Sequence, residues 1–221
     1  MRTRSGARAG LAAALAAVVA LGMAGCVPVA DEPETSTSNS AGAGSGTGAV
    51  TKQLNELTVA AAGSMKGYSR SRFPHWRKVG KNCDVRDSVL QKDGDDIKLN
   101  GCDVVGGSWK SRYDDVVLDD PAKVDIDHVV PLANAWRSGA DEWDDSKRGD
   151  FANDLTRPQL IAVSARSNRA KGDQDPSQWK PPTRAYWCQY ATDWVAVKHY
   201  WQLTVTSAEK AALADMLEGC R

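Results

Sequence analysis

The sequence predicts an α+β fold, because strand patterns and helix patterns occur together in one part of the chain. Short apolar runs around Ile97, Val104 and Val116 and over residues 124–130 have the length and composition of strands. Other segments carry apolar residues at helical spacing, together with residues that cap helices. Since these elements share one stretch of ordinary composition, we expect them to form a single domain over residues 51–221.

The helices are predicted from apolar spacing and from end signals. Ser164 can cap a helix that Gly172 stops, and Thr206 with Glu209 forms a capping box. A second short apolar run over residues 160–163 precedes the Ser164 helix, so a strand, a long loop, a strand and a helix follow in this order. The predicted helices cover residues 50–62, 84–92, 132–138, 144–151, 165–171, 183–201 and 207–219.

The N-terminal segment has the pattern of a secretory signal. Three arginines precede an apolar run over residues 11–21, and small residues lie directly before Cys26. This order resembles a bacterial lipobox, which implies a lipoprotein signal peptide over residues 1–25 and acylation of Cys26. An uncleaved transmembrane anchor is the alternative, but the apolar run is short for a bilayer. We therefore expect an exported protein, lipid-anchored to the outer face of the cell membrane or released outside the cell.

The rest of the exported chain is predicted to begin with a flexible tether and to carry almost no net charge. Residues 26–50 are rich in Ser, Gly and Thr and predict a flexible tether. Lys plus Arg and Asp plus Glu number 28 each, and three of the arginines lie in the predicted signal peptide, so the mature chain carries a balance of −3. Overall charge therefore does not favour nucleic acid, and any phosphate binding must come from a local cluster.

The cysteines predict two disulfides. If Cys26 carries lipid, Cys83, Cys102, Cys188 and Cys220 remain in an oxidising compartment. Three pairings are possible, and we predict Cys83 with Cys102 and Cys188 with Cys220 because each pair closes a local unit. A structural zinc site is the competing use, but the sequence contains no CxxC pair.

The candidate catalytic and metal-binding residues lie in the segment DIDHVVPL and in the later segment SNRAKGD. Alternation along a strand places Asp125 and Asp127 on one face and His128 on the other. Downstream, Asn168 and Lys171 are three residues apart on a short predicted helix, so they share a face.

These side chains suit phosphodiester hydrolysis, which needs a base to deprotonate water and a cation to neutralise developing charge. His128 can be neutral and basic near physiological pH. Asp127 and the amide oxygen of Asn168 are hard oxygen ligands, suited to one divalent ion, Mg²⁺ or Mn²⁺. Three nearby cations would bind flanking phosphates: Lys171, Arg169 and Arg166.

The motif DHVVP, followed by a loop, a short strand and NRAKGD, resembles the HNH or ββα-metal endonuclease superfamily. More narrowly, a set of segments resembles secreted HNH family proteins related to the C-terminal nuclease domain of GmrSD-type restriction enzymes. The likeness covers most of residues 65–221, and the motifs stand in family order. The segments are GYSRSRFPHW, CDVRDSVLQ, DIDHVVPLANAWRSGA, FANDLTRPQLIAVSARSNRAKGD and QWKPP.

The resemblance implies a ββα-metal core, also called HNH or His-Me finger, with added helices and two disulfides. It implies His128 as general base and Asp127 and Asn168 as ligands of the divalent ion. Many HNH proteins carry an Asn just before the second strand that orients the catalytic His; here that place reads RPQL, and Asn153 is the candidate. The implied activity is a monomeric endonuclease acting on DNA more readily than on RNA, leaving 5′ phosphates.

Two other functions remain open. A catalytically silent, disulfide-stapled cell-surface binding lipoprotein would explain the nearly neutral mature charge and the tether. Binding of a partner without cleavage under any divalent ion would favour it. A metallopeptidase is a poorer interpretation, because the sequence contains no HExxH segment.

Overall fold

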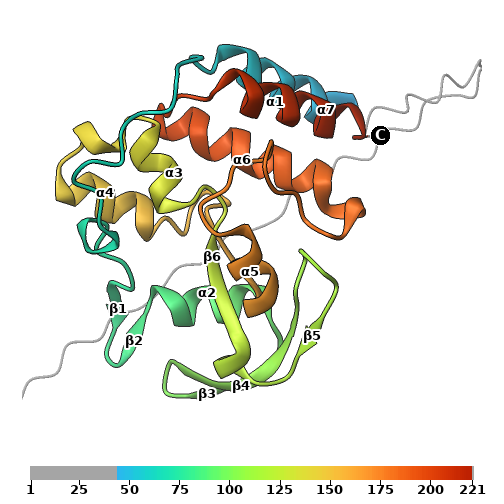
Figure 1. Ribbon diagram of the computed structural model, residues 1–221. Helices are drawn as coiled ribbons and strands as arrows, with labels where there is room; N and C mark the ends of the chain where they lie inside the picture. Colours follow the sequence, from blue (N-terminus) through green and yellow to red (C-terminus); the bar gives the residue numbers. More distant parts are fainter. Residues whose placement is uncertain (1–43, 221) are drawn as a thin grey trace, which may run out of the picture. The chain divides into compact units, whose positions relative to one another are not determined.

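The structure, a computed structural model, describes residues 44–220 and combines helices with short strands (Figure 1). The α+β prediction is therefore confirmed. The predicted signal peptide and Cys26 lie outside the described residues. The helices are α1 (Gly44–Glu56), α2 (Val85–Asp93), α3 (Leu132–Arg137), α4 (Asp145–Ala152), α5 (Ala165–Lys171), α6 (Trp187–Trp201) and α7 (Ser207–Glu218), with 3-10 turns η1 (Arg70–Arg72), η2 (Pro121–Lys123), η3 (Ala140–Glu142) and η4 (Arg184–Tyr186). The strands are β1 (Lys78–Gly80), β2 (Cys83–Asp84), β3 (Asp95–Asn100), β4 (Asp103–Lys110), β5 (Val117–Leu118), β6 (Val124–His128) and β7 (Leu160–Ser164).

The strands form small antiparallel sheets rather than one large sheet. Over the described part of the chain, β1 pairs with β2, β3 and β5 flank β4, and β6 pairs with β7. In Figure 1, α1, α6 and α7 lie together at one end, β3, β4 and β5 lie at the other, and β6 runs between them. None of the helices described is long and apolar enough to span a bilayer.

Both predicted disulfides are present. Cys83 in β2 is joined to Cys102 in the turn between β3 and β4, and Cys188 in the first turn of α6 is joined to Cys220 after α7. Each bond links elements that are already neighbours along the chain, which is why a pairing of local units could be predicted. The second bond fixes α6 and α7 as a helical hairpin against which α1 packs.

The first helix differs from its prediction at both ends. It begins at Gly44, so residues 44–50 of the predicted tether form its first turns. Helical hydrogen bonds are local, and small residues before the buried Val50 can continue the helix without burying apolar surface. It ends at Glu56 rather than near residue 62, because Val59 forms a parallel bridge with Val205. The backbone there bonds to another segment instead of continuing the helix.

Strand β7 lies at the centre of the domain and is buried at every position. Leu160 and Ala162 belong to one hydrophobic cluster, which includes buried residues of α2 and β4. Ile161 and Val163 belong to a second, larger cluster that includes the helices α1, α6 and α7. A strand that is buried on both faces has a continuous run of apolar residues in its sequence, as residues 160–163 have. This burial fixes the position of α5, which follows directly.

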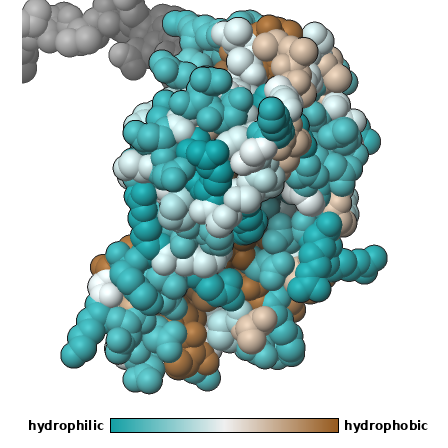
Figure 2. Space-filling model, turned by 60° about the vertical axis from the view of Figure 1, so that its left-hand side comes forward, coloured by the Kyte–Doolittle hydropathy of each residue, from teal (hydrophilic) through white to brown (hydrophobic). Residues whose placement is uncertain are grey.

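The surface in Figure 2 is largely hydrophilic, with hydrophobic patches at the top and in the lower part, the latter where Figure 1 places the short strands. The exposed apolar side chains of these strands include Val79, Leu99, Val105 and Val117. They lie on short strands, which limits the pairing of their edges with other chains.

Candidate functional site

The unit β6, β7 and α5 positions the predicted site residues. In the antiparallel pair, Asp127 lies opposite Ile161 and His128 lies opposite Leu160. The chain then enters α5 at Ser164, whose side chain accepts a hydrogen bond from the Ser167 backbone at 3.2 Å. Gly172 ends the helix with a positive φ of 54°, a conformation that favours glycine. Two strands followed by a helix are therefore formed as the sequence predicts.

The two faces of β6 carry different side chains, as expected from alternation. On the face towards α5, Asp125 Oδ2 accepts a hydrogen bond from Asn168 Nδ2 at 3.0 Å, and Asp127 forms an ion pair with Lys171 at 2.8 Å. On the other face, His128 contacts the end of α4. Asn168 and Lys171 thus share a helix face that meets the two aspartates.

These residues border a cavity of about 250 Å³ at the end of β6. Asp127, His128, Asn168 and Arg169 all line it, so the structure brings together the predicted base, both predicted metal ligands and one predicted phosphate-binding residue. The remaining lining residues are Tyr68, Arg70, Ile126, Pro131, Leu132, Ala133, Gly172 and Asp173.

The ring of His128 is held in one tautomer. Its Nε2 lies 2.9 Å from the backbone oxygen of Ala152, and a carbonyl oxygen can only accept, so Nε2 carries the hydrogen. Nδ1 then has a lone pair, and no donor to it occurs among residues 44–220. Burial lowers the pKa of His128 to about 3, although the bond to Ala152 opposes this shift. His128 is therefore neutral at physiological pH, with Nδ1 as its proton acceptor.

Asn153 does not orient His128 directly, which corrects the sequence prediction. Its Oδ1 accepts a hydrogen bond from the Arg77 backbone at 2.9 Å, and its Nδ2 donates to Pro74 O at 2.7 Å. Asn153 is the C-cap of α4, so its side chain points to the loop over residues 74–77, whereas the carbonyl one residue earlier accepts from His128. That loop carries Trp76, whose ring centroid lies 6.0 Å from that of His128.

Gln159 occupies the place before β7 where an Asn was expected, and it bonds to the backbone of Val130 rather than to His128. It is fully buried directly before β7. Its Oε1 accepts from Val130 N at 3.0 Å, and its Nε2 donates to Val130 O at 2.9 Å. Gln159 thereby fixes the chain just after His128. Its place before the second strand was the signal, but the residue type differed from the expected Asn.

Lys171 is not available for phosphate, which is a second correction. The side chain is 0% exposed, and its ammonium lies 3.0 and 2.8 Å from the two oxygens of Asp127 and 2.9 Å from His128 O. The hydroxyl of Tyr113 donates to Asp127 Oδ2 at 2.6 Å. Burial raises the pKa of Asp127 and lowers that of Lys171, while their mutual attraction opposes both shifts. Helical spacing places Lys171 on the right face but does not reveal a buried partner.

The arginines near the site divide into two groups. Arg169 lines the cavity, whereas Arg166 is exposed elsewhere on α5 and does not line it. Arg70 in η1 also lines the cavity and makes no ion pair within residues 44–220. Arg70 was not predicted as a phosphate-binding residue and belongs to the segment GYSRSRFPHW. Its two arginines beside aromatic residues were the available signal.

The oxygen donors fit a divalent cation in their chemistry. Asn168 lines the cavity, and because its Nδ2 donates to Asp125, its Oδ1 remains as an acceptor. The carboxylate of Asp127 already binds a cation, the ammonium of Lys171. Within the described residues, no three side chains of His, Cys, Asp or Glu form a metal-binding group. A metal would therefore depend on Asp127 and Asn168, with water and phosphate oxygens completing its shell.

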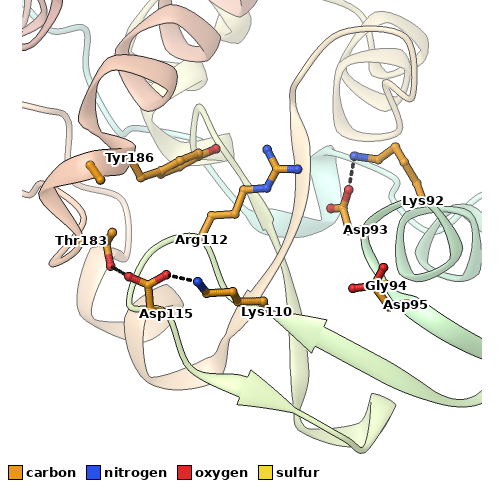
Figure 3. Close-up of a pocket in the computed structure, with 10 residues that line it drawn as sticks. Lys92, Asp93, Gly94, Asp95, Lys110, Arg112, Asp115, Thr183 and Tyr186 are labelled. Carbon is orange, nitrogen blue, oxygen red and sulfur yellow. Dashed lines mark hydrogen bonds and ion pairs between the residues drawn. The ribbon is translucent and has the colours of Figure 1, made fainter. Parts of the chain in front are cut away.

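A larger cavity of about 490 Å³ lies between α2, β4 and the segment before α6 (Figure 3). Its charged side chains largely neutralise one another, since Lys92 pairs with Asp93 at 2.7 Å and Lys110 pairs with Asp115 at 2.8 Å. Arg112 extends between these pairs in Figure 3. No histidine is among the residues that line this cavity. The cavity at the end of β6 is therefore the better candidate for catalysis.

Comparison with known proteins points to the same segment of the chain. A family model described as GmrSD restriction endonucleases, C-terminal domain, matches residues 82–216. A protein of Arthroderma benhamiae, described as an uncharacterized secreted protein, is 51% identical over 168 residues, covering 76% of this chain and 82% of that protein. No solved structure matches. The family match includes Asp127, His128 and Asn168.

Proposed function

The chain belongs to the family of the C-terminal domains of GmrSD restriction endonucleases, and from this premise we propose that it is an exported HNH-type endonuclease acting on DNA. Membership of the family indicates a nuclease-like hydrolase. The observation that supports the finer proposal best is the neutral His128, which Ala152 O holds in one tautomer and which lines a cavity that Asp127 and Asn168 also line.

In the proposed reaction, His128 Nδ1 accepts a proton from a water molecule, and the oxygen of that water attacks phosphorus. The P–O bond to the 3′ oxygen breaks in line, and the departing oxygen takes a proton from solvent, which leaves a 5′ phosphate on one product and a 3′ hydroxyl on the other. The protonated His128 then returns its proton to solvent. The hydrogen bond from Nε2 to Ala152 O keeps the ring oriented and disperses the positive charge that the proton brings. A divalent ion, Mg²⁺ or Mn²⁺, held by Asp127 and Asn168 would supply positive charge to the leaving oxygen.

Two arginines support binding of the phosphate backbone. Arg70 and Arg169 line the cavity from different segments, η1 and α5, so they flank the site of the reacting phosphate. Guanidinium groups bind phosphate oxygens through several donors. Arg166 lies outside the cavity, and a role for it would be limited to more distant phosphates.

Export and anchoring belong to the same proposal. The relative from Arthroderma benhamiae is described as secreted, and two disulfides suit an oxidising compartment. Lipid attachment at Cys26 rests on the sequence pattern alone. The proposed molecule is a monomer that acts on DNA, with RNA as a further substrate class.

Incubating the purified protein with supercoiled plasmid tests the proposed function. We expect nicking and linearisation with Mg²⁺ or Mn²⁺ and none with excess EDTA. The ends should be substrates for ligase without prior phosphorylation, because they carry 5′ phosphates. Absence of cleavage with either ion, using protein with both disulfides formed, would refute the nuclease proposal.

One observation favours the alternative of a silent binding lipoprotein. Asp127 is paired with Lys171 and is only 5% exposed, so a predicted metal ligand is engaged within the protein. Under this alternative, plasmid DNA or another partner would be retained by the immobilised protein and recovered uncut under every divalent ion. Divalent-dependent cleavage in the plasmid assay excludes it.

A further inference from the structure

Two lysines in the described chain are completely buried, and each forms an ion pair with a buried carboxylate. Lys171 pairs with Asp127 at 2.8 Å, and Lys198 pairs with Glu209 at 2.6 Å. Burying a charge is costly unless it is paired and hydrogen-bonded. Both lysines satisfy this condition, so burial alone does not distinguish them.

The surroundings of the two pairs differ. Lys198 also donates to Ser138 Oγ at 3.0 Å and to Thr204 O at 2.8 Å, and its partner Glu209 accepts from Trp194 Nε1 at 2.6 Å. These contacts join helices and lie away from the proposed site. The Lys171 ammonium contacts only Asp127 and the backbone oxygen of His128 within the described residues, and Asp127 and His128, but not Lys171 itself, line the 250 Å³ cavity.

We propose that Lys171 is a resident cation of the metal site: its ammonium occupies the cation-binding side of Asp127, and a divalent ion binds there only when this ammonium withdraws. The proposal rests on the proposed function in assigning Asp127 as a metal ligand. It goes beyond that function because the divalent ion would have to replace the Lys171 ammonium at Asp127.

The hydrogen bonds of Asp127 explain why both cations do not bind together. A carboxylate offers about four lone-pair sites. Lys171 uses a site on each oxygen, and Tyr113 uses another on Oδ2. A divalent ion beside the ammonium would meet a like charge in a buried setting, where screening by water is weak. Exchange relieves this repulsion and leaves the Tyr113 bond in place.

The position of Lys171 in the fold allows its withdrawal. It is the last residue of α5, directly before Gly172, and Gly172 lines the cavity. A lysine ammonium is carried on a flexible four-carbon chain. Because Lys171 itself does not line the cavity, its withdrawal requires the last turn of α5 to move at Gly172, whereas Lys198 lies inside α6.

Thermal unfolding of Lys171→Met and of its matched control Lys198→Met tests the exchange. In EDTA both variants should melt below the wild type, because each leaves a buried carboxylate unpaired. Mn²⁺ should raise the melting temperature of Lys171→Met strongly, that of the wild type less, and that of Lys198→Met no more than that of the wild type. Calorimetry should show Mn²⁺ binding to Lys171→Met about tenfold tighter than to the wild type.

A labelling measurement on the wild type keeps the proposal testable if Lys171→Met fails to fold. With an amine-reactive reagent and mass spectrometry, neither Lys171 nor Lys198 should be modified in EDTA. Saturating Mn²⁺ should expose Lys171 to the reagent and leave Lys198 protected.

Three results would overturn the exchange: equal Mn²⁺ affinity of the wild type and Lys171→Met, bound Mn²⁺ with Lys171 still protected, or no Mn²⁺ binding to either protein. These outcomes are separate from those of the plasmid assay. Divalent-dependent cleavage with Lys171 still protected would refute the exchange and leave the nuclease function intact.

Discussion

At the scale of single residues, the roles of the cations near the site depend on which of them already have partners. Lys171 forms an ion pair with Asp127, and Arg166 does not line the cavity. Arg70 and Arg169 therefore remain as the candidates for binding substrate phosphates. Arg70 comes from a segment distant in sequence from the NRAKGD motif. Its charge also contributes to the low pKa of His128, after burial.

Replacing Arg70 by Ala should weaken DNA binding. We expect KM for DNA to rise about tenfold and the salt dependence of binding to decrease by the equivalent of about one phosphate contact. Steady-state kinetics on a short duplex at several salt concentrations measure both quantities. Arg166→Ala serves as the comparison and should have the smaller effect; an equal or larger effect would contradict the assignment of Arg70.

The set of residues that line the candidate site could be predicted from the sequence better than their contacts. The spacing of DIDH and SNRAK fixes which side chains share a face, and Asp127, His128 and Asn168 do line one cavity. The pairing of Lys171 with Asp127 could not be predicted, because it depends on how closely α5 packs on β6. Such packing is a property of the assembled core and not of local spacing.

At the scale of elements, capping residues predicted helix boundaries well. Ser164 and Thr206, the two predicted caps, accept hydrogen bonds from the first turns of α5 and α7, and Asp84 and Asp144, predicted as the first residues of their helices, are the N-caps of α2 and α4. These signals are local and can be read from the sequence. The end of α1 could not be read in this way, because it is set by the bridge from Val59 to a distant segment.

Gln159 should be essential for the connection between β6 and α3. In Gln159→Leu the buried N–H and C=O of Val130 lose both side-chain partners, which we expect to cost about 2 to 4 kcal/mol of unfolding free energy. Urea unfolding measures this loss. The control Gln91→Leu removes one exposed hydrogen bond, to Cys102 O, and should cost under about 1 kcal/mol. Similar losses in both variants would show that Gln159 does not fix the loop.

At the scale of the whole molecule, two hydrophobic clusters meet at β7, and the site lies where the sheet β6–β7 meets the helices. The disulfides add covalent links at the periphery, one in the small strands and one in the helical hairpin. The unit formed by β6, β7 and α5 is therefore supported from both sides, although its own strands are short. The placement of this unit follows partly from the order of the elements, which can be predicted from the sequence. It also depends on how the elements pack, which cannot be predicted from the sequence.

Global stability should depend on pH through Asp193 in α6. Burial raises its pKa to about 6, although hydrogen bonds from Gln189 and Tyr186 oppose the rise. The folded protein thus holds a proton that the unfolded chain releases near pH 4, so stability falls as the pH rises from about 4 to about 7. The shift of about two pKa units corresponds to roughly 3 kcal/mol.

Asp193→Asn should remove this part of the pH dependence and should be more stable than the wild type at pH 7. Denaturant unfolding between pH 4 and pH 7 measures it, with the exposed Asp215→Asn as control. A wild-type profile that is parallel to that of Asp193→Asn would show that Asp193 titrates normally in the folded protein.

The most direct test concerns the base. His128→Ala, with circular dichroism and melting temperature checked against the wild type, should cleave plasmid DNA at least about a hundredfold more slowly. Added imidazole should restore part of the rate by entering the space that the ring leaves, and the surface variant His199→Ala should cleave normally. A folded His128→Ala protein that cuts at the wild-type rate would contradict the account.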